Sequence, residues 1–223
     1  MAYPPVKALV PMKGHSERVP GKNIRPLAGR PCFHWIVEAL LNSLYVDEVI
    51  INTDSDIISS NAIENFDVTI INRPMHLCGD MVSMAPLTEY DLSQTNGIHY
   101  LQTHSTNPLL TTETINKAIE CYFDMESHDS LFTVTEVKTR FYWADGSAIN
   151  HDPEHLIRTQ DLPPIYEENS CIYLFSRSMF EKRGHRLGEN PKMFPIDRME
   201  AVDIDDEEDF LLAEYFMLKR QGL

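Results

Sequence analysis

The sequence lacks the features of a membrane-spanning, secreted or zinc-knuckle protein. No apolar run approaches the ~18 residues that a membrane helix needs. The first residues show no basic segment followed by a long apolar core, so we expect no secretory signal. The cysteines are few and far apart, which excludes a CxxC metal site and favours the reduced thiols of a cytoplasmic protein: Cys32, Cys78, Cys121 and Cys171.

Positive charge is also scarce. The chain has 223 residues, with 19 Lys and Arg against 34 Asp and Glu, for a net charge of −15. A surface of this kind repels nucleic acid and anionic membranes, so we expect neither as a partner. Yet five of the 19 basic residues lie between positions 13 and 30. A local cationic patch on an acidic protein indicates a small anionic ligand.

Strand-like and helix-like segments alternate along the chain. The patterns predict strands over 7–12, 46–52, 68–71, 98–102, 130–135 and 171–175, and helices over 31–44, 56–64, 83–92, 112–125 and 206–220. This alternation predicts an α/β fold of one domain, residues 1–223, with a mainly parallel sheet covered by helices on both faces. Residues 138–168 break the rhythm with prolines and aromatic residues, and we interpret them as an inserted arm or small lobe.

A basic loop follows the first predicted strand. Ligands of parallel-sheet proteins bind beyond the carboxyl ends of the strands, and a glycine-containing loop there can present backbone N–H groups to phosphates. Six residues separate Gly14 from Gly21, and Asn23 follows Lys22, which excludes a Walker P-loop and a GxGxxG motif. The alternative is a flexible basic loop on the surface.

The segment KGHSERVPGKNIRPLAGRP, residues 13–31, resembles the N-terminal motif of the acylneuraminate cytidylyltransferases and of the related CMP-Kdo synthetases. This resemblance implies a Rossmann-like nucleotidyltransferase fold. It also implies that Lys13, Ser16, Arg18 and Lys22 hold the triphosphate of CTP, with Asn23 near the ribose or base. Lys13 stands where the family has Arg, which keeps the charge but loses the bidentate geometry toward phosphate.

Further segments extend the resemblance along the chain. NTDS at 52–55 is similar to the family's S-T-D-S, and the run Arg73, Pro74, Leu77, Asp80 and Ser83 to its R-P-x-x-L-x-x-D-x-x-S. The resemblance places Arg73 and Ser83 around the base, although Arg73 can equally be a surface charge before a turn. Residues 102–109 and 168–174 resemble the acceptor-side motifs, which implies acceptor contacts for Gln102, Asn169 and Tyr173. A family Arg is Glu167 here, and we expect the nearby Arg158 to substitute for it.

Six of the seven residues from 203 to 209 are acidic. Asp203 and Asp205, two apart at an expected strand end, would project to the same face. Two convergent carboxylates suit Mg²⁺, which completes its shell with phosphate oxygens and water. Helix capping is the competing interpretation, with Asp205 and Glu208 as a capping box. The cluster also resembles the family's D-I-D-x-x-x-D metal motif.

The resemblance implies transfer of CMP from CTP to the anomeric hydroxyl of a sialic-acid-like or other 2-keto-3-deoxy sugar acid, with release of pyrophosphate. Lys22, Asp203 and Asp205 would then be the catalytic residues, and the arm would cross to a second subunit of a homodimer. Two alternatives stay open. The acceptor can be a sugar phosphate or another acid, because residues 103–107 and Glu167 depart from the motifs, or the protein can be a CTP binder that has lost catalysis.

Overall fold

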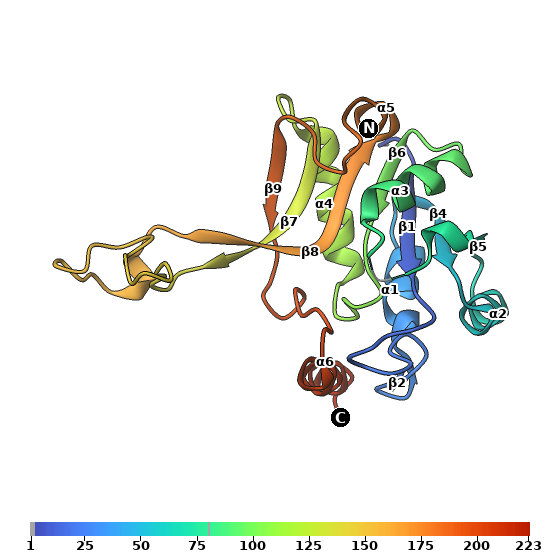
Figure 1. Cartoon of the computed structure of the whole chain (residues 1–223), viewed down its shortest axis with the longest axis horizontal. Helices are drawn as coiled ribbons and strands as arrows, with labels where there is room; N and C mark the ends of the chain where they lie inside the picture. The colour runs from blue at the N-terminus through green and yellow to red at the C-terminus, as the bar shows by residue number, and fades with distance from the viewer. Residues whose placement is uncertain (1–2, 80) are drawn as a thin grey trace.

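The fold is a seven-stranded sheet with helices on both faces (Figure 1). The computed structural model describes residues 3–79 and 81–223. Met1, Ala2 and Asp80 lie outside the described residues. The structure therefore does not describe the Asp of the motif that begins at Arg73. No helix in the described part is long and apolar enough to cross a bilayer.

The strands stand in the order β5-β4-β1-β6-β8-β7-β9. Their bounds are β1 Val6–Met12, β4 Val46–Thr53, β5 Thr69–Asn72, β6 His99–Gln102, β7 Ser130–Val137, β8 Ile165–Ser176 and β9 Pro191–Pro195. β8 runs antiparallel to its neighbours β6 and β7, and the other pairs are parallel. The mainly parallel sheet is therefore confirmed, with one reversed strand inside it.

Helices cover the two faces because apolar side chains alternate along the central strands. Val6, Ala8 and Val10 of β1 face one core with α1 (Cys32–Leu41), α2 (Asp56–Asn65) and α4 (Thr112–Asp124). Leu9 faces the opposite core, which α3 (Met84–Ser93) and α5 (Arg177–Arg183) cover. A third cluster packs α6 (Glu207–Arg220) against the short β2–β3 ribbon (Pro26–Leu27 and Arg30–Pro31).

The expected elements all occur, with ends shifted by a few residues. The sequence patterns missed β9, α5, the β2–β3 ribbon and the one-turn helices η1 (Met75–Leu77) and η2 (Thr159–Asp161). Prolines at both ends of β9 obscure it, and such a strand is tolerated because it lies at the edge of the sheet. β8 begins at Ile165, not at residue 171, so the last residues of the expected arm are strand.

β7 and β8 continue out of the body and carry residues 138–164 as a projecting arm (Figure 1). Their pairing is interrupted between Phe132 and Val134, opposite residues 169–172, which include Asn169 and Ser170. Ser170 has a left-handed φ of 58°, which is uncommon for a residue with a side chain. This irregularity, which we call the β7–β8 bulge, separates the part of the ladder inside the sheet from the part inside the arm.

One carboxyl group is buried beneath α3. Asp91 is 1% exposed, and one of its oxygens accepts a hydrogen bond from the Nδ2 of Asn52, at the end of β4. Its other oxygen has no partner among the described residues. Burial raises the pKa of Asp91 from 3.8 to about 7, and the hydrogen bond from Asn52 and the charge of Arg73 only partly oppose this.

This raised pKa predicts a pH-dependent stability. Between about pH 4 and 7 the folded protein keeps the Asp91 proton and the unfolded chain releases it, so the contribution of Asp91 is lost as the pH rises through this range. Asp91→Asn removes the effect. We expect the unfolding free energy of this variant, relative to wild type, to increase by up to about 4 kcal/mol from pH 4 to 8.

Urea unfolding across this pH range measures the difference, with Asp47→Asn on an exposed residue of β4 as the control. A difference between Asp91→Asn and wild type that does not change with pH would contradict the prediction.

Candidate active site

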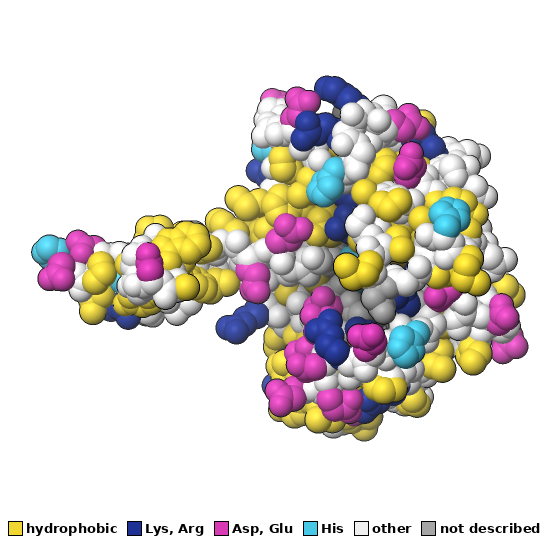
Figure 2. Space-filling view, viewed as in Figure 1, with side chains coloured by type: hydrophobic (Ala, Val, Ile, Leu, Met, Phe, Trp, Pro, Cys, Tyr) yellow, Lys and Arg dark blue, Asp and Glu magenta, His cyan; other side chains and the backbone are white. Residues whose placement is uncertain are grey.

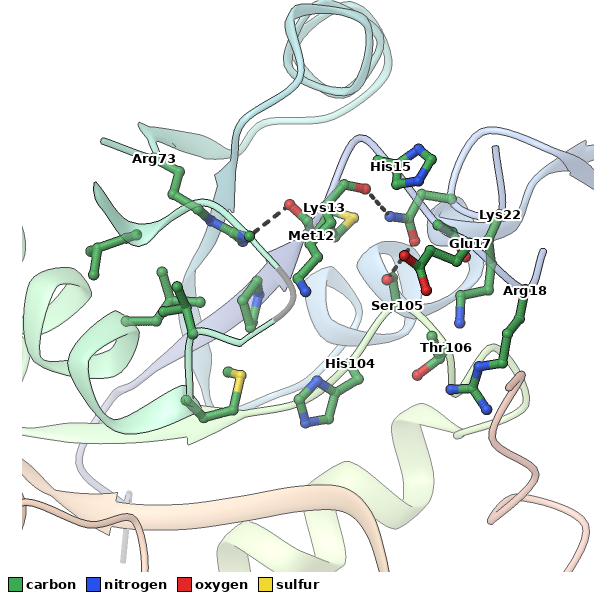
Figure 3. Close-up of a pocket in the computed structure, with 18 residues that line it drawn as sticks. Met12, Lys13, His15, Glu17, Arg18, Lys22, Arg73, His104, Ser105 and Thr106 are labelled. Carbon is green, nitrogen blue, oxygen red and sulfur yellow. Dashed lines mark hydrogen bonds between the residues drawn. The ribbon is translucent and has the colours of Figure 1, made fainter. Parts of the chain in front are cut away.

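A pocket of about 410 Å³ opens beyond the carboxyl ends of β1 and β6 (Figure 3). The basic loop after β1 forms one wall, and residues 104–106 after β6 form the floor. Leu77, Val82, Met84 and Leu87, before and within α3, line the other end. The pocket therefore has a charged half and an apolar half, a division that suits the triphosphate and the base of a nucleotide.

Hydrogen bonds to two neighbouring strand ends hold the basic loop in place. The Gly14 N–H donates to Asp54 Oδ1 at 2.7 Å. A side chain at Gly14 has no room, because its Cβ would lie 2.8 Å from the Cβ of Ser55. Asn23 donates from Nδ2 to the Lys13 carbonyl at 2.8 Å and accepts from Ser105 Oγ at 2.6 Å. Asn23 thus lines the pocket, and its amide ties the loop to the segment after β6.

The structure brings Lys13, Ser16, Arg18 and Lys22 together in the pocket lining. Figure 3 shows the side chains of Arg18 and Lys22 side by side near Thr106. Lys22 Nζ donates to the Ile204 carbonyl, and burial lowers the Lys22 pKa against the opposing charges of Asp203 and Asp205. The loop is therefore not a loose surface segment, because its cations converge on one cavity.

Arg73 is buried, so the interpretation as a surface charge is wrong. Its Nε donates to Asn52 Oδ1 at 2.8 Å, and its Nη2 donates to the carbonyls of Met12 and Asn52 at 3.1 and 3.0 Å. Because Asn52 also donates to Asp91, a hydrogen-bonded chain runs from the core beneath α3 to a guanidinium that lines the pocket. Ser83 is exposed and is not part of the described lining.

Asp203 and Asp205 do not lie at a strand end, which corrects that expectation. Residues 202–205 form neither strand nor helix. Ile204, between the two aspartates, is held by a hydrogen bond from its N–H to the Thr106 carbonyl at 2.9 Å and by burial against α6. The expected capping box is also shifted by one residue. Asp206 caps α6, and its reciprocal partner is Asp209.

The shift leaves Asp203 and Asp205 outside the cap. Asp203 Oδ1 is buried without a partner among the described residues, and burial raises the Asp203 pKa, with the charge of nearby Asp205 adding to the effect. Asp205 accepts from Arg18 Nη2 at 2.7 Å in an exposed pair, which is worth little energetically and separates easily. No group of three metal-ligating side chains occurs in the described part of the chain. Two carboxylates, one with an orphaned oxygen, fit Mg²⁺ that takes its remaining ligands from phosphate and water.

A second polar cluster lies beside the pocket, at the junction of β6 and β8. Gln102 Oε1 accepts from Arg186 Nη1 at 3.2 Å, and the Arg186 guanidinium stacks 3.7 Å over the Tyr173 ring. The Tyr173 hydroxyl donates to Glu168. The structure thus brings Gln102 and Tyr173 together as the motifs imply, around an arginine that no motif indicated.

Two other residues expected at the acceptor lie elsewhere. Asn169 donates to Thr135 Oγ1 at 3.1 Å and accepts from the Cys171 N–H at 3.3 Å, so it holds the β7–β8 bulge. Arg158 sits in the arm, where its Nε donates to Asp161 at 2.6 Å. Arg158 is exposed and belongs to the arm, which projects away from the sheet that holds Gln102 (Figure 1).

His104 and Thr106 also line the pocket and were not singled out from the sequence. Burial lowers the pKa of His104 to about 4, and the nearby charges of Arg186 and Lys22 add to this, so its ring is neutral at physiological pH. Their position directly after a parallel strand was the available signal, because the carboxyl ends of β1 and β6 meet at one edge of the sheet.

Comparison with known proteins agrees with this geometry. A family model described as cytidylyltransferase matches residues 7–221. Flagellin modification protein B of Campylobacter coli is 26% identical over 95% of this chain and 94% of its own length. A pseudaminic acid cytidylyltransferase of Campylobacter jejuni is 26% identical over 92% and 93%. An N-acylneuraminate cytidylyltransferase of Escherichia coli is 24% identical over 92% of this chain, but only 50% of that longer protein is covered.

Solved structures show the same fold. CMP:2-keto-3-deoxy-manno-octonic acid synthetase, in complex with CTP, superposes with a TM-score of 0.71 over 97% of this chain and 99% of its own, at 15% identity. A 4-diphosphocytidyl-2C-methyl-D-erythritol synthase of Anaerococcus prevotii gives a TM-score of 0.68 over 96% and 99%, also at 15% identity. Since the family model spans nearly the whole chain, this nucleotidyltransferase belongs to the cytidylyltransferase family.

Proposed function

We propose that this protein transfers CMP from CTP to the anomeric hydroxyl of a nonulosonic or other 2-keto-3-deoxy sugar acid. The observation that carries the proposal is the two-part pocket at the carboxyl ends of β1 and β6, with its cations converging at one end beside Asp203 and Asp205. The names of the relatives supply the acceptor class, since they act on pseudaminic and N-acylneuraminic acids. CTP as substrate and four unpaired cysteines suit the reducing cytoplasm.

In this reaction the acceptor oxygen forms a bond to the α-phosphorus while the bond from that phosphorus to the bridging oxygen of pyrophosphate breaks. The products are the CMP-sugar acid, pyrophosphate and the hydroxyl proton. The transfer needs no covalent enzyme intermediate, so the protein acts by positioning and by neutralising charge. Lys13, Ser16, Arg18 and Lys22 hold the departing pyrophosphate, and the apolar half of the pocket receives the base near Arg73.

Asp203 and Asp205 are the residues that would hold Mg²⁺. When bound, Mg²⁺ neutralises phosphate charge and lowers the pKa of a coordinated hydroxyl. The chain supports this role locally. Ile204 fixes the backbone between the two carboxylates, and Lys22 binds the Ile204 carbonyl, so the carboxylates and the phosphate-binding lysine are held against each other.

Asp205→Asn tests the metal assignment. We expect the rate of pyrophosphate release to fall by at least about 100-fold, because the variant loses a charged ligand where transition-state charge is neutralised. Stability should change little, since the ion pair with Arg18 is exposed. The measurement is pyrophosphate release against Mg²⁺ concentration, together with thermal unfolding.

Glu208→Gln is the matched control, because Glu208 is an exposed acid of the same cluster, in the first turn of α6. It should retain the wild-type rate. Full activity of Asp205→Asn would exclude Asp205 as a metal ligand.

A panel of acceptors tests the reaction itself. Wild-type protein with CTP and Mg²⁺ should release pyrophosphate with one of the sialic, legionaminic, pseudaminic or Kdo-type acids, and not without metal. A signal with a sugar phosphate in place of the acids would favour the alternative acceptor class. CTP binding without pyrophosphate release from any acceptor would indicate a protein that has lost catalysis.

We also propose that the protein is a homodimer formed through the arm. Apolar side chains gather along the arm among charged and polar ones (Figure 2). Several of them are exposed in the single chain: Tyr142, Trp143, Ile149, Leu156 and Ile157. Monomers rarely expose so concentrated an apolar surface, and the arm has little core of its own to bury it. A second copy of the chain would cover these side chains.

Sedimentation of the double variant Trp143→Asp, Leu156→Asp tests the dimer. We expect the dimer dissociation constant to rise at least tenfold, because two charges would enter an apolar contact. Tyr215→Asp, on the exposed side of α6, is the control and should leave the dimer intact. A wild-type protein that sediments as a monomer at all concentrations would exclude the dimer.

A further inference from the structure

We propose that Arg186 binds the carboxylate of the acceptor acid and, together with Gln102, makes the enzyme specific for acids. The inference rests on the proposed function, because it names a residue for the acceptor of that reaction. It begins from an observation of the fold alone. Arg186, in the loop between α5 and β9, is a half-buried cation without an anionic partner.

Acids outnumber basic residues in this chain, so carboxylates are available to pair with many of its cations. Six other arginines form ion pairs with carboxylates: Arg18, Arg25, Arg30, Arg158, Arg177 and Arg183. Among the described residues, no ion pair is formed by Arg73, Arg140, Arg186, Arg198 or Arg220. The one side-chain hydrogen bond of Arg186 is the donation to Gln102. The nearby Glu168 accepts the Tyr173 hydroxyl and stays outside ion-pair distance. A half-buried cation of this kind is costly unless an anion arrives.

Gln102 supplies a second group that a ligand could bind. Its side chain is 0% exposed, and its Nε2 has no partner among the described residues. The orientation of the amide follows from chemistry, since a guanidinium only donates and therefore binds the oxygen of Gln102. The Thr88 hydroxyl, 3.4 Å away, donates to the same oxygen. The Nε2 is thus a buried donor that an acceptor atom of a ligand would satisfy.

The Tyr173 ring fixes the plane of the Arg186 guanidinium at 3.7 Å. A stacked guanidinium keeps its edge available for two parallel hydrogen bonds, and a carboxylate matches that edge. A planar carboxylate between Arg186 and Gln102 would satisfy the cation and the orphaned amide together. This cluster has one cation, whereas the triphosphate loop has several, which favours a singly charged carboxylate over a phosphate ester.

His104 connects this cluster to the nucleotide pocket. It lines the pocket (Figure 3), and the charges of both Arg186 and Lys22 act on it. An acid bound at Arg186 would therefore lie close to His104, and so close to the CTP pocket that this ring lines. Because the His104 ring is neutral at physiological pH, it contributes no cation that would compete for the carboxylate.

Arg186→Met tests the assignment, with pseudaminic acid and its C1 carboxamide as probes. Calorimetric titration into the protein loaded with CTP, without Mg²⁺, measures acceptor binding independently of turnover. We expect wild type to bind the acid at least about 30-fold more tightly than the carboxamide, and Arg186→Met to bind the two within about threefold. CTP affinity should stay within twofold, and with Mg²⁺ the KM of the acid should rise far more than that of CTP.

Arg183→Met is the matched control, because it removes one arginine of the neighbouring helix α5 that pairs only with Glu189. Arg186→Lys keeps the charge and loses the paired donors, so its preference for the acid should fall between wild type and Arg186→Met. If Arg186→Met is unstable, the lysine variant decides the question by the same acid-to-carboxamide ratio.

The outcomes separate the two proposals. An Arg186→Met protein that prefers the acid as strongly as wild type overturns the role of Arg186 and leaves the transferase proposal standing. If wild type binds CTP and no member of the acid panel, the role of Arg186 and the sugar-acid acceptor are both overturned. Tight binding of the acid without pyrophosphate release overturns the proposed catalysis alone.

Discussion

The parallel pairing of β1 with β4 on one side and β6 on the other decides where the functional segments lie. Because the three strands point the same way, the basic loop, the segment at 52–55 and residues 103–106 emerge at one edge of the sheet. Hydrogen bonds then join these three segments directly, through Gly14, Asn23 and their partners. The parallel direction of the strands therefore determines where the pocket lies, and individual side chains determine its lining.

Charge is distributed unevenly for a related reason. The chain is strongly acidic, and six of its eleven arginines pair with carboxylates, while basic side chains gather around the site in two places. One is the basic loop, where several cations converge on one cavity. The other is the stack of Arg186 on Tyr173, which lies close enough to His104 for its charge to act on that ring. Each place offers positive charge to a small anion, in contrast to the acidic balance of the whole chain.

The sequence revealed the sheet and the nucleotide side of the site more fully than the acceptor side. Short apolar runs and helical patterns predicted the main strands and helices. Contiguous motifs pointed to Lys13, Ser16, Arg18 and Lys22, which the fold brings together. The sequence pointed to Asp203 and Asp205, but the strand end expected for them was wrong. The burial of Ile204 and the capping of α6 by Asp206 determine the local backbone instead. Arg186 could not be found, since it meets Gln102 only through the return of β8 beside β6. Local sequence patterns do not indicate contacts between residues that are far apart in the chain.

The β7–β8 bulge has a consequence for the evolution of the arm. On one side of the bulge the two strands belong to the sheet, and on the other they form the stem of the arm. The direction of the arm is therefore set at Asn169 and Ser170, where the ladder is interrupted, and not by the residues at its tip. Insertions, deletions and substitutions at the tip can accumulate while the stem keeps its angle and Tyr173 keeps its place. β8 thus joins the tip of the arm, where sequence changes disturb little, to the buried part of the sheet, where packing restricts them.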